Sequence, residues 1–189
     1  MPEFTLTAAP PLAGYDRDFG AVTLKAPEHL AIVSIALPLG GEDAAKKAIK
    51  AAFGVNLPEV GRSDVAKDKS AALMRLSSDQ AFALFPCETP DAERQIAAKL
   101  DGAAYTTDQS DVWCALEISG TGARAALERI CMIDLHPDAF ALNAIARTVM
   151  EHLGVIIART GDNTYLLLSA SSSAQSFLHA LETSIENTQ

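Results

Sequence analysis

Basic residues are few in this 189-residue chain, in which 15 Lys and Arg face 24 Asp and Glu and the formal net charge is −9. An acidic surface repels phosphate backbones and anionic lipids, so we expect neither nucleic acid nor membrane partners. No apolar run approaches the roughly 20 residues that a membrane-spanning helix needs. The first residues also lack a basic segment followed by an apolar stretch, so we expect no secretory signal and a cytoplasmic location.

Cysteine is equally scarce, and its three positions, Cys87, Cys114 and Cys131, show no C-x-x-C spacing. This argues against a disulfide framework and a zinc site, and it fits a reducing compartment. Cys114 and Cys131 fall at apolar positions of an expected strand and helix, where we predict packing in the core. The four histidines are far apart and lack H-x-x-x-H or H-E-x-x-H spacing, so we predict no metal site. They are His29, His136, His152 and His179.

Hydrophobic residues make up 49% of the chain, enough for a proper core. Residues 1–30 are rich in Pro, Gly and Ala and show little periodicity, so we predict an extended N-terminal arm. Residues 31–107 form a first half, and residues 57–69 within it are predicted to be a loop. The expected elements of that half are a strand at 31–39, a helix at 44–53, strands at 71–76 and 81–85, a helix capped by Thr89 with Pro90 first, and a strand at 103–107.

Residues 108–189 form a second half with a similar series of elements. We expect a strand at 113–118, a helix at 123–131, two or three strands across 144–169, and a last helix capped by Ser172 or Ser173. The segments SSDQAFALF and TGDNTYLLL align Phe82 with Tyr165 and Leu84 with Leu167, and a second match aligns Leu37 with Leu116. These matches predict an α+β fold: two pseudo-repeated β-α-β-β-α-β-like halves packed into one compact unit.

The stretch from Gly120 to Ala125 has the spacing G-x-G-x-x-A of a dinucleotide-binding turn. Such a turn needs an acidic residue about 20 positions later, at the end of a following strand. The next candidate acid, Asp134, comes too early, and His136-Pro137 leaves no room for that strand. We therefore interpret the stretch as a tight strand-to-helix turn whose glycines permit unusual backbone angles.

Other candidates for chemistry are weak. Glu151 and His152 are adjacent, and neighbouring residues of a strand face opposite sides. Ser110 lies between Asp108 and Asp111 without a G-x-S-x-G context, so hydrogen bonding within a turn is favoured over nucleophilic catalysis. Trp113 is expected to anchor the core. We predict no catalytic, cofactor-binding or metal-ligating residue in this chain.

An ordered series of features resembles the gamma subunit of bacterial heterotetrameric sarcosine oxidase. The resemblance covers most of residues 31–185, is looser in the first half, and leaves residues 1–30 outside it. It is carried by Asp108-Gln109-Ser110-Asp111, the Trp113 strand, Ser119-Gly120 with Ala123-Arg124, Asp134-Leu135 with Phe140, Arg147-Thr148, Val155–Arg159 and Ser173-Ala174.

The resemblance implies a non-catalytic subunit that packs against alpha, beta and delta subunits. Those partners would carry the cofactors, FAD, FMN, NAD and tetrahydrofolate, and this chain none. The complex implied by the resemblance oxidises sarcosine to glycine, reduces oxygen to hydrogen peroxide, and releases formaldehyde or 5,10-methylenetetrahydrofolate. Whether this chain adds anything to an enzyme's turnover is left open at this point.

The same resemblance implies a fold like the folate-binding domain of aminomethyltransferases, in which paired half-domains surround a tetrahydrofolate. Those proteins place paired aspartates after a Gly-Ile or Gly-Val step, whereas this chain continues from Gly154 to Arg159 without a carboxylate. Without a carboxylate in this run, the chain lacks the acid that would polarise a folate amine. Two alternatives stay open: a stand-alone folate-binding protein of one-carbon or iron–sulfur metabolism, and a nucleotide-dependent enzyme at Gly120–Ala125.

Overall fold

The computed structural model describes residues 9–188, which form four helices and two antiparallel sheets. The prediction of an α+β fold is confirmed. In chain order the elements are β1 (Asp16–Asp18), β2 (Thr23–Lys25), β3 (Leu30–Ala36), α1 (Glu42–Phe53), β4 (Arg62–Val65), β5 (Ala72–Arg75), β6 (Gln80–Pro86), α2 (Ala92–Leu100), β7 (Tyr105–Asp108), β8 (Trp113–Ser119), α3 (Ala123–Glu128), β9 (Ile145–Met150), β10 (Leu153–Gly161), β11 (Thr164–Ala170), a 3₁₀ turn (Ser171–Ser173) and α4 (Ala174–Glu186).

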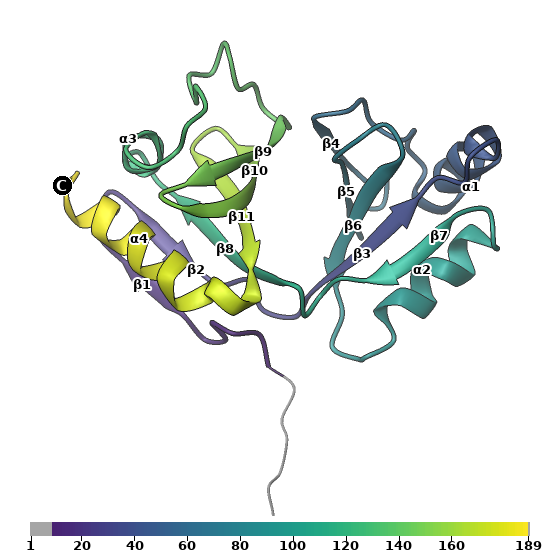
Figure 1. The fold of residues 1–189 in the computed structure, drawn as a ribbon, viewed down its shortest axis with the longest axis horizontal. Helices are drawn as coiled ribbons and strands as arrows, with labels where there is room; N and C mark the ends of the chain where they lie inside the picture. Colours follow the sequence, from purple (N-terminus) through teal and green to yellow (C-terminus); the bar gives the residue numbers. More distant parts are fainter. Residues whose placement is uncertain (1–8, 189) are drawn as a thin grey trace, which may run out of the picture.

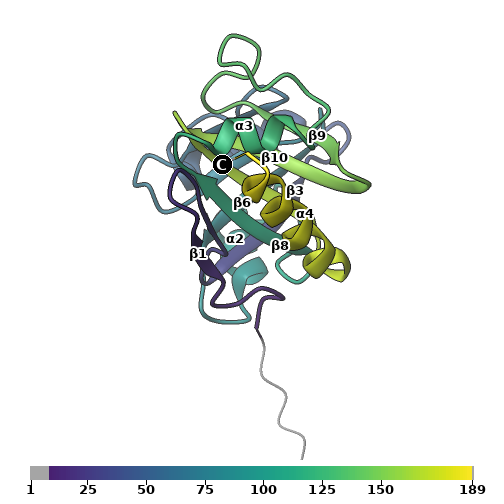
Figure 2. The same ribbon diagram turned by 90° about the vertical axis from the view of Figure 1, so that its left-hand side faces the viewer.

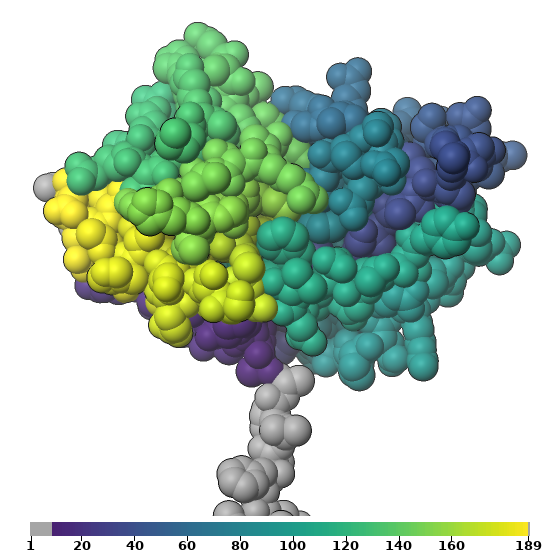
Figure 3. Space-filling model, viewed as in Figure 1, coloured from purple at the N-terminus to yellow at the C-terminus, as the bar shows by residue number. Residues whose placement is uncertain are grey.

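The two sheets pack face to face, and the helices cover their outer faces. The smaller sheet has the order β4-β5-β6-β3-β7, and the larger has β1-β2-β8-β11-β10-β9. Helices α1 and α2 lie outside the smaller sheet, and α3 and α4 outside the larger one (Figures 1 and 2). The space-filling view shows the two halves in contact along a boundary between green-yellow and blue-teal surfaces (Figure 3). No helix among the described residues is long and apolar enough to cross a bilayer.

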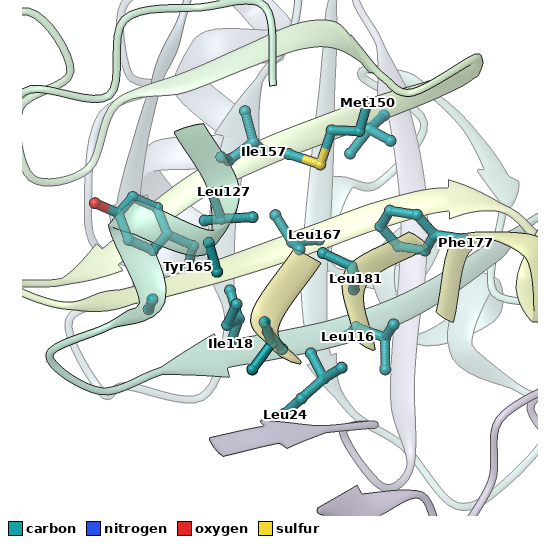
Figure 4. Packing of buried hydrophobic residues seen from close by; sticks show 14 of the residues in the cluster. Leu24, Leu116, Ile118, Leu127, Met150, Ile157, Tyr165, Leu167, Phe177 and Leu181 are labelled. Atoms are coloured by element: carbon teal, nitrogen blue, oxygen red, sulfur yellow. The ribbon is translucent and has the colours of Figure 1, made fainter. Parts of the chain in front are cut away.

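Each half has its own core between a sheet and its helices, as the periodicity predicts. In the first half, α1 directs the stripe Ala45, Ile49 and Phe53 at the sheet and ends at Gly54, whose φ of 70° suits glycine. In the second half, side chains of β8, β11 and α4 meet around Leu116, and Leu24 of β2 joins them (Figure 4). A third cluster fills the space between the two sheets.

The two halves are pseudo-repeated, but the sequence alignment is out of register by one residue in the hairpin strand. Phe82 and Leu84 face the space between the sheets, whereas Tyr165 and Leu167 face the helices. Side chains alternate along a strand, so a shift of one residue exchanges the two faces. Arg75 pairs with Ala81 in the first hairpin, and the equivalent Arg159 pairs with Tyr165 in the second. Ala81 is therefore equivalent to Tyr165, and the next residue, Phe82, is equivalent to Leu166.

The second sequence match is also wrong in register, because Leu37 lies beyond the end of β3. Sheet pairing gives the correct equivalence: Val33 lies opposite Ala83 in the smaller sheet as Leu116 lies opposite Leu167 in the larger. Both pairs face the helical side of their sheets. Val33, not Leu37, is therefore the equivalent of Leu116.

Two equivalent arginines support this register. Arg75 ends β5 and Arg159 lies near the end of β10, and each guanidinium donates to two carbonyls of the following turn and one of the loop before the neighbouring edge strand. The acceptors of Arg75 are Ser77 at 3.2 Å, Ser78 at 2.8 Å and Pro58 at 3.1 Å; those of Arg159 are Gly161 at 3.3 Å, Asp162 at 2.8 Å and Phe140 at 3.0 Å. The repeat therefore extends to side-chain hydrogen bonds.

The N-terminal segment differs from the extended arm that the sequence predicts over residues 1–30. Strands β1 and β2 are paired members of the larger sheet, and β2 pairs with β8 through Leu24 and Ile118. Leu12, Val22 and Leu24 are buried in the core of the second half. Residues 1–8, which include Pro2, lie outside the described residues. The division of the remaining chain at residue 107 stays a prediction.

Two side chains fasten this segment to the last helix. Tyr15 Oη donates to Glu182 Oε1 at 2.7 Å, and Arg17 pairs with the same oxygen at 2.9 Å and with Glu186 at 3.2 Å. Arg17 also lies over the ring of Phe19, 4.3 Å from its centre. The hydrogen bond from Tyr15 lowers the pKa of Glu182.

Other boundaries differ locally. The prediction of a loop over residues 57–69 is wrong at β4, which lies within that range. The strand was not predicted because its short sequence, Arg-Ser-Asp-Val, lacks an apolar alternation. Helix α2 begins at Ala92, so Thr89 does not cap it and Pro90 precedes it. Helix α4 does begin after Ser173, but no side chain caps its first turn.

Candidate functional site

The turn from Gly120 to Ala125 holds the N-terminal segment against β8 and α3. Gly120 has a φ of 114°, and a Cβ there would lie 2.3 Å from the carbonyl oxygen of Ala21. The backbone N–H of Gly122 donates to that same oxygen at 3.1 Å. The glycines therefore allow a close backbone approach and an unusual φ, which confirms the interpretation as a tight strand-to-helix turn.

The histidines do not converge. His29, His136, His152 and His179 are all exposed and lie in different parts of the fold. Among residues 9–188 no group of three or more His, Cys, Asp or Glu side chains is placed to hold a metal ion. The absence of metal-ligating residues stays a prediction.

Glu151 and His152 form the turn between β9 and β10, so the expectation that they lie within a strand is wrong. Glu151 has a positive φ of 54°, as such a tight turn requires. Both side chains are exposed. Two exposed side chains in such a turn lack the enclosed surroundings typical of a catalytic site.

Ser110 joins the two halves through hydrogen bonds and confirms the turn that the sequence favours. Its backbone N–H donates to Asp108 Oδ1 at 2.9 Å, and its Oγ accepts from the N–H of Ile32 at 3.1 Å. The hydroxyl oxygen is therefore engaged with the backbone of β3. No hydrogen bond between this hydroxyl and a histidine is present among the described residues.

Trp113 lies at the start of β8 and packs into the cluster between the sheets, as expected of a core anchor. Its ring meets Phe82 edge to face, with centres 5.9 Å apart and planes at 61°. The indole Nε1 is buried without a hydrogen-bond partner in the described part of the chain. The contact between the Trp113 and Phe82 rings connects β8 of the second half to β6 of the first.

The space between the sheets is where the resemblance implies a folate. Ile156 and Ala158 of β10 point into that space where the related domain is expected to carry carboxylates, and Ile156 is only 2% exposed. The same cluster is closed by apolar side chains from both halves: Ile32, Met74, Phe82, Leu84, Ile145 and Leu168. A pteridine needs polar partners and room, and these residues supply neither, so they do not fit tetrahydrofolate.

The thiols are in packing positions. Cys114 is buried on β8, and burial raises its pKa to about 11. Cys131 is half-buried, and burial raises its pKa as well. Both thiols are therefore protonated at neutral pH and poor nucleophiles, which agrees with the predicted packing role.

A groove of about 900 Å³ opens where the two halves and the N-terminal segment meet. It is lined by residues from five segments, 9–12, 26–32, 87–92, 108–115 and 171–172, and we call it the junction groove. Its ionisable side chains are His29, Cys87, Cys114, Glu88, Asp108 and Asp111. The sequence pattern could not reveal it, because the five segments are brought together only by the folded topology.

Comparison with known proteins identifies relatives for most of the chain. A family model described as "Sarcosine oxidase, gamma subunit family" matches residues 40–186. Sarcosine oxidase subunit gamma from Corynebacterium sp. (strain P-1) is 29% identical over 134 residues, covering 71% of this chain and 66% of that protein. The protein of the same name from Arthrobacter sp. is 30% identical over 121 residues, covering 64% of this chain and 60% of that protein. The matched region thus spans less than two thirds of these relatives.

Solved structures agree with these matches. A chain of the heterotetrameric sarcosine oxidase from Corynebacterium sp. U-96 superposes with a TM-score of 0.76 and 25% identity, covering 88% of this chain and 85% of that one. Aminomethyltransferase T of the glycine cleavage system from Bartonella henselae gives a TM-score of 0.62 at 15% identity, covering 84% of this chain and 44% of that one. The second likeness shows the fold alone, and it confirms the expected similarity to the aminomethyltransferase fold.

Proposed function

Because the chain belongs to the sarcosine oxidase gamma subunit family, we propose that it is a non-catalytic subunit of a heterotetrameric complex that oxidises sarcosine. In this proposal the alpha, beta and delta subunits carry the flavins FAD and FMN, together with NAD and tetrahydrofolate. They convert sarcosine to glycine, with oxygen reduced to hydrogen peroxide. The one-carbon unit leaves as formaldehyde or 5,10-methylenetetrahydrofolate, and the assembly works in the cytoplasm.

The observation that carries the proposal is the superposition on a chain of a heterotetrameric sarcosine oxidase over 88% of this chain. The side chains support a structural role. The serine and cysteine candidates are engaged in hydrogen bonding or packing, and the interior between the sheets is apolar. What the chain offers a partner is therefore contact surface, including exposed apolar side chains such as Met132 and Tyr105.

Purification through a tag on the full chain, from cells that express its natural partners, tests the proposal. We expect larger subunits to co-purify, a visible flavin spectrum in the complex, and sarcosine-dependent production of hydrogen peroxide. The isolated chain serves as the control and should show neither the spectrum nor the activity. Recovery of the chain without any partner, or peroxide production by the isolated chain, would contradict the proposal.

A thermal-shift titration with tetrahydrofolate separates this proposal from a stand-alone folate-binding protein. Since the space between the sheets is filled by apolar side chains, we expect no saturable increase in the Tm of the isolated chain. The Ile156→Ala variant, which opens that space, serves as a matched test of whether packing is what excludes the ligand. A saturable shift of several degrees in the unmodified chain would favour the stand-alone alternative.

A further inference from the structure

The junction groove has an acidic rim. Glu88, Asp108 and Asp111 line it and are exposed, and no Lys or Arg among residues 9–188 does so. His29 is the one other side chain of the lining that can carry a positive charge. The rim therefore attracts cations and repels phosphate, folate and other anions.

The wall of the same groove is apolar. Leu12 is buried, Leu30 is half-buried, and the side chain of Val112 is 46% exposed beside Asp111. Pro10, Pro11, Pro27 and Pro90 add rigid apolar surface without backbone donors. A groove with such a wall and a charged rim resembles the apolar centre and polar rim of protein–protein interfaces.

A short stretch of sheet edge is also open in the groove. The N–H of Ile32 donates to Ser110 Oγ at 3.1 Å, and its carbonyl accepts from Gln109 N–H at 2.8 Å, so these groups point away from β6. Alternate residues of an antiparallel strand point their backbone groups to the same side, so those of Leu30 also point away from β6. Strand β7 does not cover Leu30, because β7 ends at Asp108, opposite Val33.

We propose that the junction groove binds an extended, basic segment of a partner subunit, a role that rests on the proposed function. An extended segment alternates its side chains, so Lys or Arg can reach the acidic rim while apolar neighbours contact the wall. Its backbone pairs with the outward N–H and carbonyl of Leu30, which have no partner among residues 9–188, as in recognition by strand addition. The complementary charge speeds association and selects against acidic partners.

Neutralising the rim in the full chain tests this inference. The groove variant combines Glu88→Gln, Asp108→Asn and Asp111→Asn, which keep the shape and the turn at Ser110. The control variant combines Glu59→Gln, Asp64→Asn and Asp162→Asn, which make the same change in net charge outside the groove. Thermal melting of both variants verifies that they fold. The rate at which each tagged chain joins the remaining subunits is then measured at low salt and at about 0.5 M salt.

We expect the groove variant to associate about tenfold more slowly at low salt, the difference to vanish at high salt, and the control to stay within about twofold of the natural chain. Equal rates for both variants would overturn the groove inference and leave the proposed function intact. Failure of the natural chain to join any subunit would instead contradict the proposed function itself.

Carbodiimide coupling of the assembled natural complex provides a second measurement. Because it uses no variant, its result does not depend on whether a variant folds. The reagent joins a carboxylate to an amine in direct contact, so we expect Glu88, Asp108 or Asp111 to be linked to lysines of one partner segment. Links confined to other carboxylates of the chain would overturn the proposal. Links from the groove to a second copy of this chain, or to its own N-terminal residues, would also overturn it.

Discussion

The two sheets have equivalent strand orders, but one pair of equivalent strands, β7 and β2, comes from different places in the chain. In the smaller sheet, β7 follows α2 directly and pairs with β3. In the larger sheet, no strand follows α4 within the described residues, and β2 occupies the place beside β8. The second half thus matches the first in architecture while depending on residues far away in the sequence.

The two equivalent strands, β7 and β2, contribute unequally to the cores of their halves. β7 is mostly exposed, and its side chains contribute little to a core. The N-terminal segment buries Leu12, Val22 and Leu24 in the core of the second half and is fastened to α4 through Glu182. The second half is therefore complete only when the N-terminal segment and α4 pack together.

The largest effect is expected from removing residues 1–26. Burial of each of the three leucine and valine side chains contributes roughly 1.5–3 kcal/mol, so the loss exceeds about 4 kcal/mol and leaves β8 with an open edge. Urea unfolding followed by circular dichroism measures it, with Leu24→Ala as the partial version at roughly 2–5 kcal/mol. An unchanged midpoint in the truncated chain would show that the second half folds without β2.

A smaller effect is expected from Gly120→Ala. The new Cβ would meet the carbonyl oxygen of Ala21 at 2.3 Å at a φ of 114°, so the β1–β2 hairpin must move. We expect a loss of about 3 kcal/mol. The matched control is Gly40→Ala in the first half, which has a φ of 76° but nothing within 4 Å of a new Cβ, and it should lose about 1 kcal/mol. Equal losses would contradict the close-approach argument.

Replacing each of the two equivalent arginines tests whether they contribute equally to the free energy of unfolding. Arg159 is 7% exposed and Arg75 is half-buried, although both donate to three carbonyls. Arg159→Ala removes a buried guanidinium and its buried hydrogen bond to the carbonyl of Phe140, and we expect a loss of about 3 kcal/mol in the free energy of unfolding. Arg75→Ala should lose about 1 kcal/mol because water can replace its hydrogen bonds. A larger loss at Arg75 would reverse the comparison.

The smallest effect is a pH dependence confined to the second half. Since its folded-state pKa is lowered below the ordinary value of 4.5, Glu182 adds stability above that value and loses it as pH falls through the folded pKa. The contribution is under about 1 kcal/mol because the pair is partly exposed. Unfolding curves of the natural chain and Glu182→Gln should converge below pH 4.5. A constant difference at all pH values would contradict the assignment.

Most elements of the fold could be predicted from periodicity, because β3, α1, β6 and α4 combine apolar faces with sharp ends. The strands β1, β2 and β4 could not, since their short sequences are mostly polar and show no apolar alternation. Their pairing partners lie far along the chain, and no local signal names them.

The repeat was detectable from sequence, but its register was not. Phe82 resembles the aromatic Tyr165 more than Leu166, so residue similarity favours the wrong register. Only the direction of the side chains, toward helices or toward the other sheet, separates the two alignments. The junction groove could not be predicted either, because its carboxylates come from connections that are far apart in the sequence.

The position of β2 also has a consequence for the order of events during synthesis. The ribosome releases this strand early, but β8 and α4, against which it packs, emerge only after the whole first half has been made. The first half has all its partners by then and can fold as a unit. We therefore expect the β1–β2 hairpin to stay unpaired on the growing chain and to join its sheet only after β8 and α4 have been synthesised.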